Sequence, residues 1–198
     1  MIPTLEILVL SWDEIYSLLY ELSRRIKHEY CPEIVIGVAR GGLIPARIIA
    51  DLLDVPTLGS IGVRFYEDIS QRLRNPIIIQ PLNISVANKR VLLIDDIVDT
   101  GESLTLVASE VKTKAGDLKT ATIYRKPLTC FTPDYSAQET DVWVVFPWEL
   151  RETIKKIGKR LLNSGITFQE VRNYLRLAGL DGELTRSYLE EVFGESKL

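Results

Sequence analysis

The stretch that decides the fold reads Val91-Leu92-Leu93-Ile94-Asp95-Asp96-Ile97-Val98-Asp99-Thr100-Gly101-Glu102-Ser103. A run of apolar residues is followed at once by two adjacent acids. Because a buried, unpaired carboxylate costs several kcal/mol, we expect Asp95 and Asp96 at the rim of a sheet, where the strand ends. Gly101 then permits unusual backbone dihedrals, and the small hydroxyl residues beside it let successive N–H groups converge at the start of a helix.

This arrangement indicates a site for a sugar phosphate. The turn from Asp99 to Ser103 has the composition of an anion nest that suits a phosphate monoester, and the two acids can meet a magnesium ion or sugar hydroxyls. The alternative is a strand followed by a capped, Asp-rich turn without a ligand. The sequence contains neither G-x-x-x-x-G-K-[ST] nor G-x-G-x-x-G after the first core strand, so an ATPase P-loop and a dinucleotide fold are not supported.

Apolar runs and helical spacings alternate on both sides of this stretch. We expect helices near 11–28, 45–53 and 102–114, and strands at 34–38, 91–94, 121–124 and 142–146. The main strands are not joined by hairpin turns. The pattern predicts an α/β fold, an open and mostly parallel sheet flanked by helices, with its ligand at the carboxyl ends of the strands.

Length and composition restrict the class of protein. The chain has 198 residues, 46% hydrophobic and 26% charged, which fits one domain with a small appendage. Residues 151–198 have a purely helical pattern, with a capping box at Thr167 and Glu170, so we predict a core at 1–150 and a helical extension at 151–198. Two cysteines and one histidine exclude a disulfide framework, a four-ligand zinc site and a Ser-His-Asp enzyme.

The sequence also predicts the location of the protein and excludes some classes of partner. No apolar run approaches the ~20 residues of a membrane span, so we expect a soluble, cytoplasmic protein without a membrane partner. The net charge of -3 argues against nucleic-acid binding, as does the interleaving of arginines with acids in the extension.

The decisive stretch resembles the 5-phosphoribosyl-1-pyrophosphate (PRPP) motif of type I phosphoribosyltransferases. The resemblance implies that Asp95 and Asp96 bind the ribose hydroxyls and hold Mg²⁺, and that Asp99 exchanges a proton with the base. It assigns the 5-phosphate to the loop formed by Asp99, Thr100, Gly101, Glu102 and Ser103. Val38-Ala39-Arg40-Gly41-Gly42-Leu43 is similar to the family's pyrophosphate loop, which implies that Ala39, Arg40 and Gly41 bind pyrophosphate.

Within the family, residues 8–150 resemble the bacterial xanthine-guanine branch and its archaeal purine relatives. Ala121 to Pro127 is similar to the strand that brings a lysine, here Lys126, to the exocyclic oxygen of a 6-oxopurine. Asp141 to Glu149 is similar to the segment that binds the base, with Trp143 stacking and Val144 making main-chain contacts; the alternative for the tryptophans is core packing. Arg64 and Tyr66 fall where the family has a mobile lid loop, although a polar stretch of this kind is often only a surface loop.

The resemblance implies a purine phosphoribosyltransferase that joins a free base to PRPP and releases a nucleoside monophosphate and pyrophosphate. Lys126 favours the 6-oxopurines hypoxanthine, guanine and xanthine. An adenine enzyme on the same core is the first alternative, and a non-catalytic PRPP-sensing regulator is the second. A homodimer is expected, as is common in this family and among soluble enzymes.

Overall fold

The computed structural model describes residues 6–67 and 74–195. By its internal contacts the chain divides into two compact units, residues 13–141 and residues 1–12 together with 142–198. Residues 142–150 therefore belong to the same compact unit as the helices that follow them. The division into a core at 1–150 and an extension at 151–198 stays a prediction. None of the described helices is both long and apolar enough to cross a bilayer.

The larger unit is an α/β structure. Along the chain its elements are α1 (Trp12–Glu29), β2 (Ile34–Ala39), α2 (Leu43–Leu52), β3 (Leu58–Glu67), β4 (Arg74–Gln80), β5 (Arg90–Val98), α3 (Glu102–Lys112), β6 (Asp117–Arg125) and β7 (Tyr135–Glu139). Its six strands form one sheet in the order β4-β3-β2-β5-β6-β7, and only the β3–β4 pair is antiparallel. The predicted open, mostly parallel sheet is confirmed.

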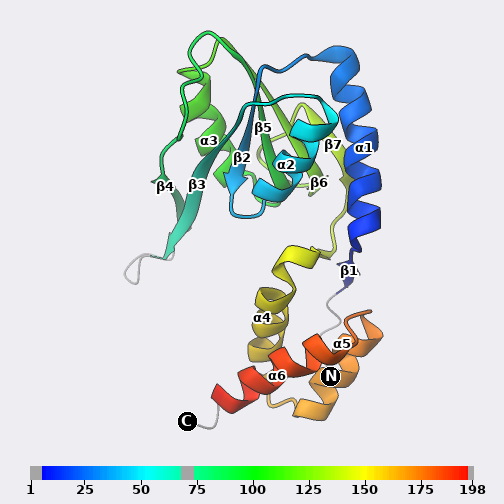
Figure 1. The fold of residues 1–198 in the computed structure, drawn as a ribbon. Coiled ribbons are helices and arrows are strands. Elements are labelled where there is room, and N and C mark those ends of the chain that lie inside the picture. The colour runs from blue at the N-terminus through cyan, green and yellow to red at the C-terminus, as the bar shows by residue number, and fades with distance from the viewer. Residues whose placement is uncertain (1–5, 68–73, 196–198) are drawn as a thin grey trace. The chain divides into compact units, whose positions relative to one another are not determined.

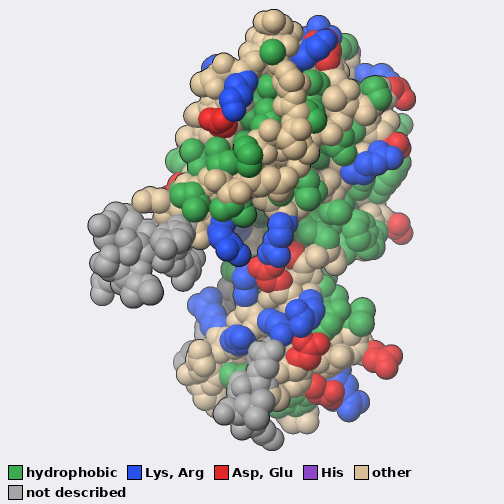
Figure 2. All heavy atoms as spheres, turned by 60° about the vertical axis from the view of Figure 1, so that its left-hand side comes forward, with side chains coloured by type: hydrophobic (Ala, Val, Ile, Leu, Met, Phe, Trp, Pro, Cys, Tyr) green, Lys and Arg blue, Asp and Glu red, His purple; other side chains and the backbone are tan. Residues whose placement is uncertain are grey.

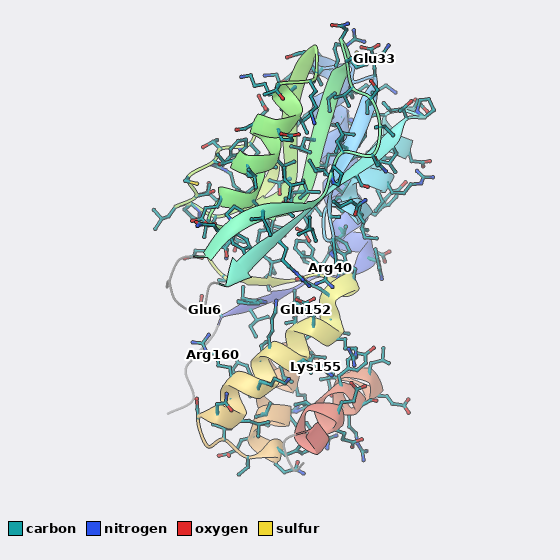
Figure 3. All side chains as sticks on the ribbon, turned by 90° about the vertical axis from the view of Figure 1, so that its left-hand side faces the viewer. Glu6, Glu33, Arg40, Glu152, Lys155 and Arg160 are labelled. Carbon is teal, nitrogen blue, oxygen red and sulfur yellow. The ribbon has the colours of Figure 1, made fainter. Side chains whose placement is uncertain are left out.

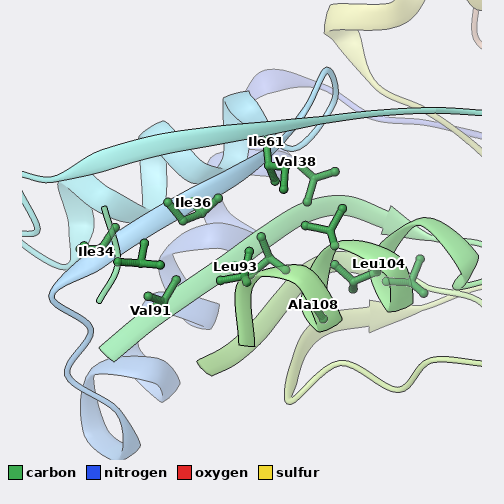
Figure 4. Close-up of a cluster of buried hydrophobic side chains, with 12 residues drawn as sticks. Ile34, Ile36, Val38, Ile61, Val91, Leu93, Leu104 and Ala108 are labelled. Carbon is green, nitrogen blue, oxygen red and sulfur yellow. The ribbon is translucent and has the colours of Figure 1, made fainter. Parts of the chain in front are cut away.

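Helices cover both faces of this sheet. Figure 1 shows α3 on one side of the strands and α1 and α2 on the other. The alternation of strand side chains explains the arrangement: Ile36 and Leu93 face the α3 side, where Leu104 and Val107 complete a buried cluster (Figure 4). Gly37 faces the opposite side, where a Cβ atom on it would lie 3.0 Å from the Cβ of Ala46 in α2.

Two expectations from the sequence are corrected here. Residues around Arg64 were assigned to a loop, but Arg64 and Tyr66 lie in β3 and pair with Ile77 and Asn75 of β4. The apolar run at 142–146 was expected as a strand of the main sheet, but Trp143–Val145 forms a separate parallel sheet with Ile7–Val9. In both cases pairing with another strand decides the outcome, and the pattern within the segment itself does not predict that partner.

The smaller unit combines that second sheet with three helices. Its elements are β1 (Ile7–Val9), β8 (Trp143–Val145), the 3-10 helix η1 (Pro147–Glu149), α4 (Leu150–Asn163), α5 (Phe168–Leu177) and α6 (Glu183–Glu195). Val145 of β8 packs with Ile154, Leu175 and Leu189 of the helices in one buried cluster. The predicted capping box of α5 is confirmed, because Thr167 and Glu170 exchange both hydrogen bonds. The predicted helical appendage is therefore present and has a core of its own.

A carboxylate fastens the segment before β7 to β6. Asp134 accepts hydrogen bonds of 2.8 Å from the Thr120 N–H, the Thr120 hydroxyl and the Lys119 Nζ. Burial by itself raises the pKa of Asp134, but the bonds from Lys119 and Thr120 outweigh it and hold the pKa below its ordinary value. The ionised form is therefore the one that stabilises the fold.

We expect Asp134→Asn to lower the free energy of unfolding by about 1 kcal/mol at pH 7, because an amide nitrogen then faces donors. A carboxylate with a depressed pKa stabilises above its unfolded pKa of ~3.9 and loses that contribution as the pH falls through the folded value. The difference between wild type and variant, measured by urea unfolding, should therefore be smaller at a pH near 2.5 than at pH 7. Asp51→Asn, which removes the exposed ion pair with Arg47, is the matched control and should change stability by less than about 0.5 kcal/mol. An equal difference at both pH values would contradict this account.

Candidate functional site

The acid pair, Asp95 and Asp96, lies where β5 has a neighbouring strand on one side only. β5 loses its β2 neighbour after the Gly37–Ile94 pair, while on its other side β6 still pairs with Asp95, Ile97 and Val98. We expected the strand to end at the acids, and this is wrong: β5 continues to Val98. The carboxylates still avoid the middle of the sheet, because β2 turns away at Ala39 and leaves that side to a loop.

The carboxylates are held close together. The Asp95 carboxylate accepts a hydrogen bond of 3.0 Å from the Asp96 N–H, and the Asp96 carboxylate accepts one of 2.8 Å from the Ile97 N–H. Asp96 is only 8% exposed. Burial raises the pKa of Asp95 well above its ordinary value, and the negative charge of Asp96 raises it further. A pair of this kind favours a cation or a hydroxyl donor placed between the two groups.

The loop after β2 lies directly against this pair. A Cβ atom on Gly41 would lie 1.9 Å from Oδ2 of Asp96, and one on Gly42 would lie 2.5 Å from the Ile94 carbonyl oxygen. Only glycine permits this approach of backbone to carboxylate. The peptide bond between Ala39 and Arg40 is cis. Arg40 is exposed and directly follows β2, whereas Glu33 directly precedes it at the other end of the strand (Figure 3). The Arg40–Gly42 loop and the acid pair therefore share one edge of the sheet.

The turn after β5 forms the next part of this edge. Gly101 has φ +91°, and a Cβ atom on it would lie 2.5 Å from the Thr129 Oγ1 and 2.7 Å from the Phe131 backbone nitrogen. Helix α3 begins at Glu102, so its first amides have no carbonyl one turn earlier and can bind an anion. The Glu102 N–H also donates a bond of 3.4 Å to the Thr100 Oγ1. Asp99, Thr100 and Glu102 are exposed, and Ser103 is half-buried.

A segment that we did not predict holds this turn in place. The Cys130 N–H donates to the Thr100 carbonyl oxygen at 2.9 Å, and the Lys126 N–H donates to that of Val98 at 2.8 Å. Residues 129–131 therefore support the turn at 99–103, which is the predicted phosphate loop. The local sequence could not reveal this role, because it arises from the register of β5 against β6.

The remaining predicted residues have different positions. Lys126 is half-buried and follows β6 at the same edge as the acid pair. The last pair between β2 and β3 joins Ala39 and Gly62. Arg64 lies beyond that pair in β3 and is exposed. The side chain of Tyr66 lies outside what the structure describes. The larger unit thus gathers the predicted pyrophosphate loop, acid pair, phosphate loop and lysine at the carboxyl ends of its strands.

Trp143 and Val144 belong to the other compact unit. Trp143 is 39% exposed, which leaves part of its ring accessible, while the Val144 side chain is buried. Trp148 stacks on Phe146 with ring centroids 4.7 Å apart and also contacts Trp12 at 5.7 Å. Core packing therefore accounts for Trp148, whereas Trp143 keeps a face for a ligand.

Comparisons with known proteins agree with this geometry. The model of the phosphoribosyl transferase domain matches residues 8–154. The xanthine-guanine phosphoribosyltransferase of Cereibacter sphaeroides is 31% identical over 146 residues, which cover 71% of this chain and 85% of that protein. A solved purine phosphoribosyltransferase from Pyrococcus horikoshii Ot3 is 38% identical, with a TM-score of 0.66 over 72% of this chain and 93% of that one.

A structure from Helicobacter pylori, of a xanthine-guanine-hypoxanthine phosphoribosyltransferase, has a TM-score of 0.64 at 22% identity and supports the fold alone. The family match covers the β2 loop, the acid pair, the phosphate loop and Lys126, and it ends within α4. The resemblance stated from the motifs, and with it the expectation of a transferase fold, is confirmed. This chain belongs to the phosphoribosyltransferase family.

Proposed function

We propose that this chain is a magnesium-dependent purine phosphoribosyltransferase, acting in purine salvage, that prefers 6-oxopurines. It transfers the 5-phosphoribosyl group of PRPP to a free base and gives a nucleoside monophosphate and pyrophosphate. The observation that carries the proposal is the contact between the Gly41 backbone and the Asp96 carboxylate. It brings a loop suited to pyrophosphate against acids suited to ribose.

The two carboxylates fit a magnesium ion. Mg²⁺ is usually bound through one or two carboxylates together with substrate phosphates, and it keeps several waters. In the described part of the chain no group of three or more His, Cys, Asp or Glu side chains is placed to hold a metal. We assign the ion to Asp95 and Asp96, with the other ligands supplied by PRPP and water. When bound, Mg²⁺ supplies positive charge to the leaving pyrophosphate.

In the proposed reaction the bond between C1′ of the ribose and the pyrophosphate oxygen breaks, and a bond from C1′ to a ring nitrogen of the base forms. The ribosyl group develops positive charge, which the carboxylates of Asp95 and Asp96 stabilise. Arg40 binds the departing pyrophosphate. The amides of Gly101 and Ser103 hold the 5-phosphate, and Asp99 exchanges a proton with N7 of the base.

Lys126, Trp143 and Val144 are proposed to bind the base. The Lys126 ammonium can donate to an exocyclic oxygen but not to the amino group of adenine. Trp143 offers a partly exposed ring for stacking, and the backbone of Val144 can read the edge of the base. Arg64 and Tyr66, in the part of β3 that pairs with β4 beyond its last pair with β2, are proposed to contact PRPP.

Homodimerisation and a cytoplasmic location are further parts of the proposal. Binding of nucleic acid is not part of it, because cations and acids are mixed on the surface of helices α4 to α6 (Figure 2). Ion pairs link Arg151 and Lys155 to Glu191, and Lys156 to Glu152. Their charges are largely balanced within the unit.

The test is turnover with PRPP and Mg²⁺ against hypoxanthine, guanine, xanthine and adenine separately, detecting both nucleotide and pyrophosphate. We expect turnover of 6-oxopurines, and we expect Lys126→Ala to lower their kcat/KM by about 10- to 100-fold, the loss of one charged hydrogen bond. Lys112→Ala, in α3, is the control and should leave all rates unchanged. Preference for adenine would contradict the base assignment alone, whereas PRPP binding without turnover of any base would indicate a regulator.

A further inference from the structure

Thr122 of β6 contacts the backbone of the acid pair. Its side chain is fully buried, and in the register of β5 against β6 it pairs with Asp95. The Thr122 hydroxyl donates to the Asp96 carbonyl oxygen at 3.0 Å and also lies 2.9 Å from the Tyr124 carbonyl oxygen. A hydroxyl has a single proton, so these two carbonyl groups share one donor.

The carbonyl group that Thr122 holds belongs to the same peptide group as the amide that holds the Asp96 carboxylate. The Asp96 C=O and the Ile97 N–H form one planar unit, in which they point in opposite directions. The Ile97 N–H donates to the Asp96 carboxylate at 2.8 Å. Fixing the carbonyl oxygen therefore fixes the direction of the N–H, and with it the position of the carboxylate.

The two hydrogen bonds also strengthen each other. A donor on a carbonyl group polarises the peptide, which makes its N–H a stronger donor. The bonds run from the Thr122 hydroxyl through the 96–97 peptide to the carboxylate, so loss of the first bond weakens the second. On its other side the carboxylate lies against the Gly41 backbone, which leaves it little space for another orientation.

We propose that Thr122 is a positioning residue for the acid pair: through the 96–97 peptide it sets the orientation in which the Asp96 carboxylate meets PRPP and Mg²⁺. The inference rests on the proposed function, because it names what orients a group assigned there to ribose and metal. Thr122 itself is fully buried and does not touch the substrate. The role belongs to its hydroxyl and not to its methyl group.

Three variants separate this role from packing. Thr122→Val removes the hydroxyl and keeps the shape of the side chain, whereas Thr122→Ser keeps the hydroxyl. Thr120→Val is the matched control: Thr120 lies two residues earlier on the same strand, is 3% exposed, and donates its hydroxyl to the Asp134 carboxylate at 2.8 Å. In that variant Asp134 keeps its bonds from the residue 120 N–H and the Lys119 Nζ, so the segment before β7 stays fastened.

The first measurement is hydrogen exchange of the Ile97 amide, followed by NMR without any ligand. Exchange should be about 10-fold faster in Thr122→Val than in wild type, the effect of weakening one hydrogen bond. The amide of Leu93, in the buried part of β5, is the internal reference that corrects for a change in global stability. Thr122→Ser and Thr120→Val should exchange as wild type does. Equal exchange of the Ile97 amide in Thr122→Val and wild type would overturn the proposal.

The second measurement is the binding of PRPP in the presence of Mg²⁺ by titration calorimetry, together with steady-state kinetics. Thr122→Val should raise the dissociation constant and the KM for PRPP by about 3- to 10-fold and change kcat by less than about 2-fold. Thr122→Ser should recover wild-type values, and Thr120→Val should keep them. In the Asp96→Ala background Thr122→Val should have no further effect, because the carboxylate that it positions is absent.

These outcomes keep the two proposals apart. Wild type that neither binds PRPP nor transfers its phosphoribosyl group contradicts the proposed function, while exchange of the Ile97 amide still shows whether Thr122 holds the peptide. Wild type that turns over, with a Thr122→Val variant that binds PRPP equally well, overturns the positioning role alone. The same holds for a loss that Thr122→Ser does not recover, or one that persists in full without the Asp96 carboxylate.

Discussion

The double variant Asp96→Ala, Asp99→Ala is expected to lose phosphoribosyl transfer by about 10⁴-fold while remaining folded. Asp96 faces the Gly41 backbone, and Asp99 is exposed at the turn that follows. The first is proposed to hold ribose and metal, and the second to exchange a proton with the base. Removing both takes away charge stabilisation and proton transfer from the same reaction.

The single variants should separate the two roles. Asp96→Ala should mainly raise the KM for PRPP, whereas Asp99→Asn should mainly lower kcat, because its role is confined to proton exchange. Asp51→Ala, an exposed acid on α2, is the control and should keep wild-type kinetics. Steady-state assays with PRPP varied at saturating base provide the measurement, and circular dichroism reports the fold. Activity of the double variant within tenfold of wild type would refute the proposed mechanism.

The sequence predicts the strands and helices that carry the site because their signals are local. Four consecutive apolar residues at 91–94 identify the centre of β5, and the spacing of Ile15, Leu19, Leu22 and Ile26 identifies the buried face of α1. The cap and the charged residues of α5 are equally local, and the capping box at Thr167 is present as expected. A pattern that depends only on neighbours within one helical turn or one strand therefore predicts the element that the structure shows.

What depends on distant partners could not be predicted. The continuation of β5 to Val98 depends on where β2 turns away and on how long β6 keeps pairing. The pairing of β1 with β8 joins residues that are more than a hundred positions apart. The support of the turn at 99–103 by residues 129–131 follows from the same long-range register. These features are set by tertiary pairing, which overrides local propensity.

Gly41, in the loop after β2, provides the sharpest test of the site geometry. We expect Gly41→Ala to lower kcat/KM by about 100-fold, because displacement of a catalytic group by about 1 Å has an effect of this size. The added Cβ would lie 1.9 Å from Oδ2 and 2.5 Å from Cγ of Asp96, so the carboxylate must move. The Asp96 side chain is short, and its carboxylate accepts a hydrogen bond from the Ile97 N–H. The carboxylate therefore cannot move without losing that bond.

Gly194→Ala is the matched control, since a Cβ atom there meets nothing within 4 Å. Its kinetics should equal those of wild type. The decisive measurement places Gly41→Ala in the Asp96→Ala background: if the glycine acts through the carboxylate, its substitution should have little further effect once the carboxylate is gone. Additive losses would instead show that the loop acts on its own, through its contact with pyrophosphate, and that its approach to Asp96 is not what the reaction requires.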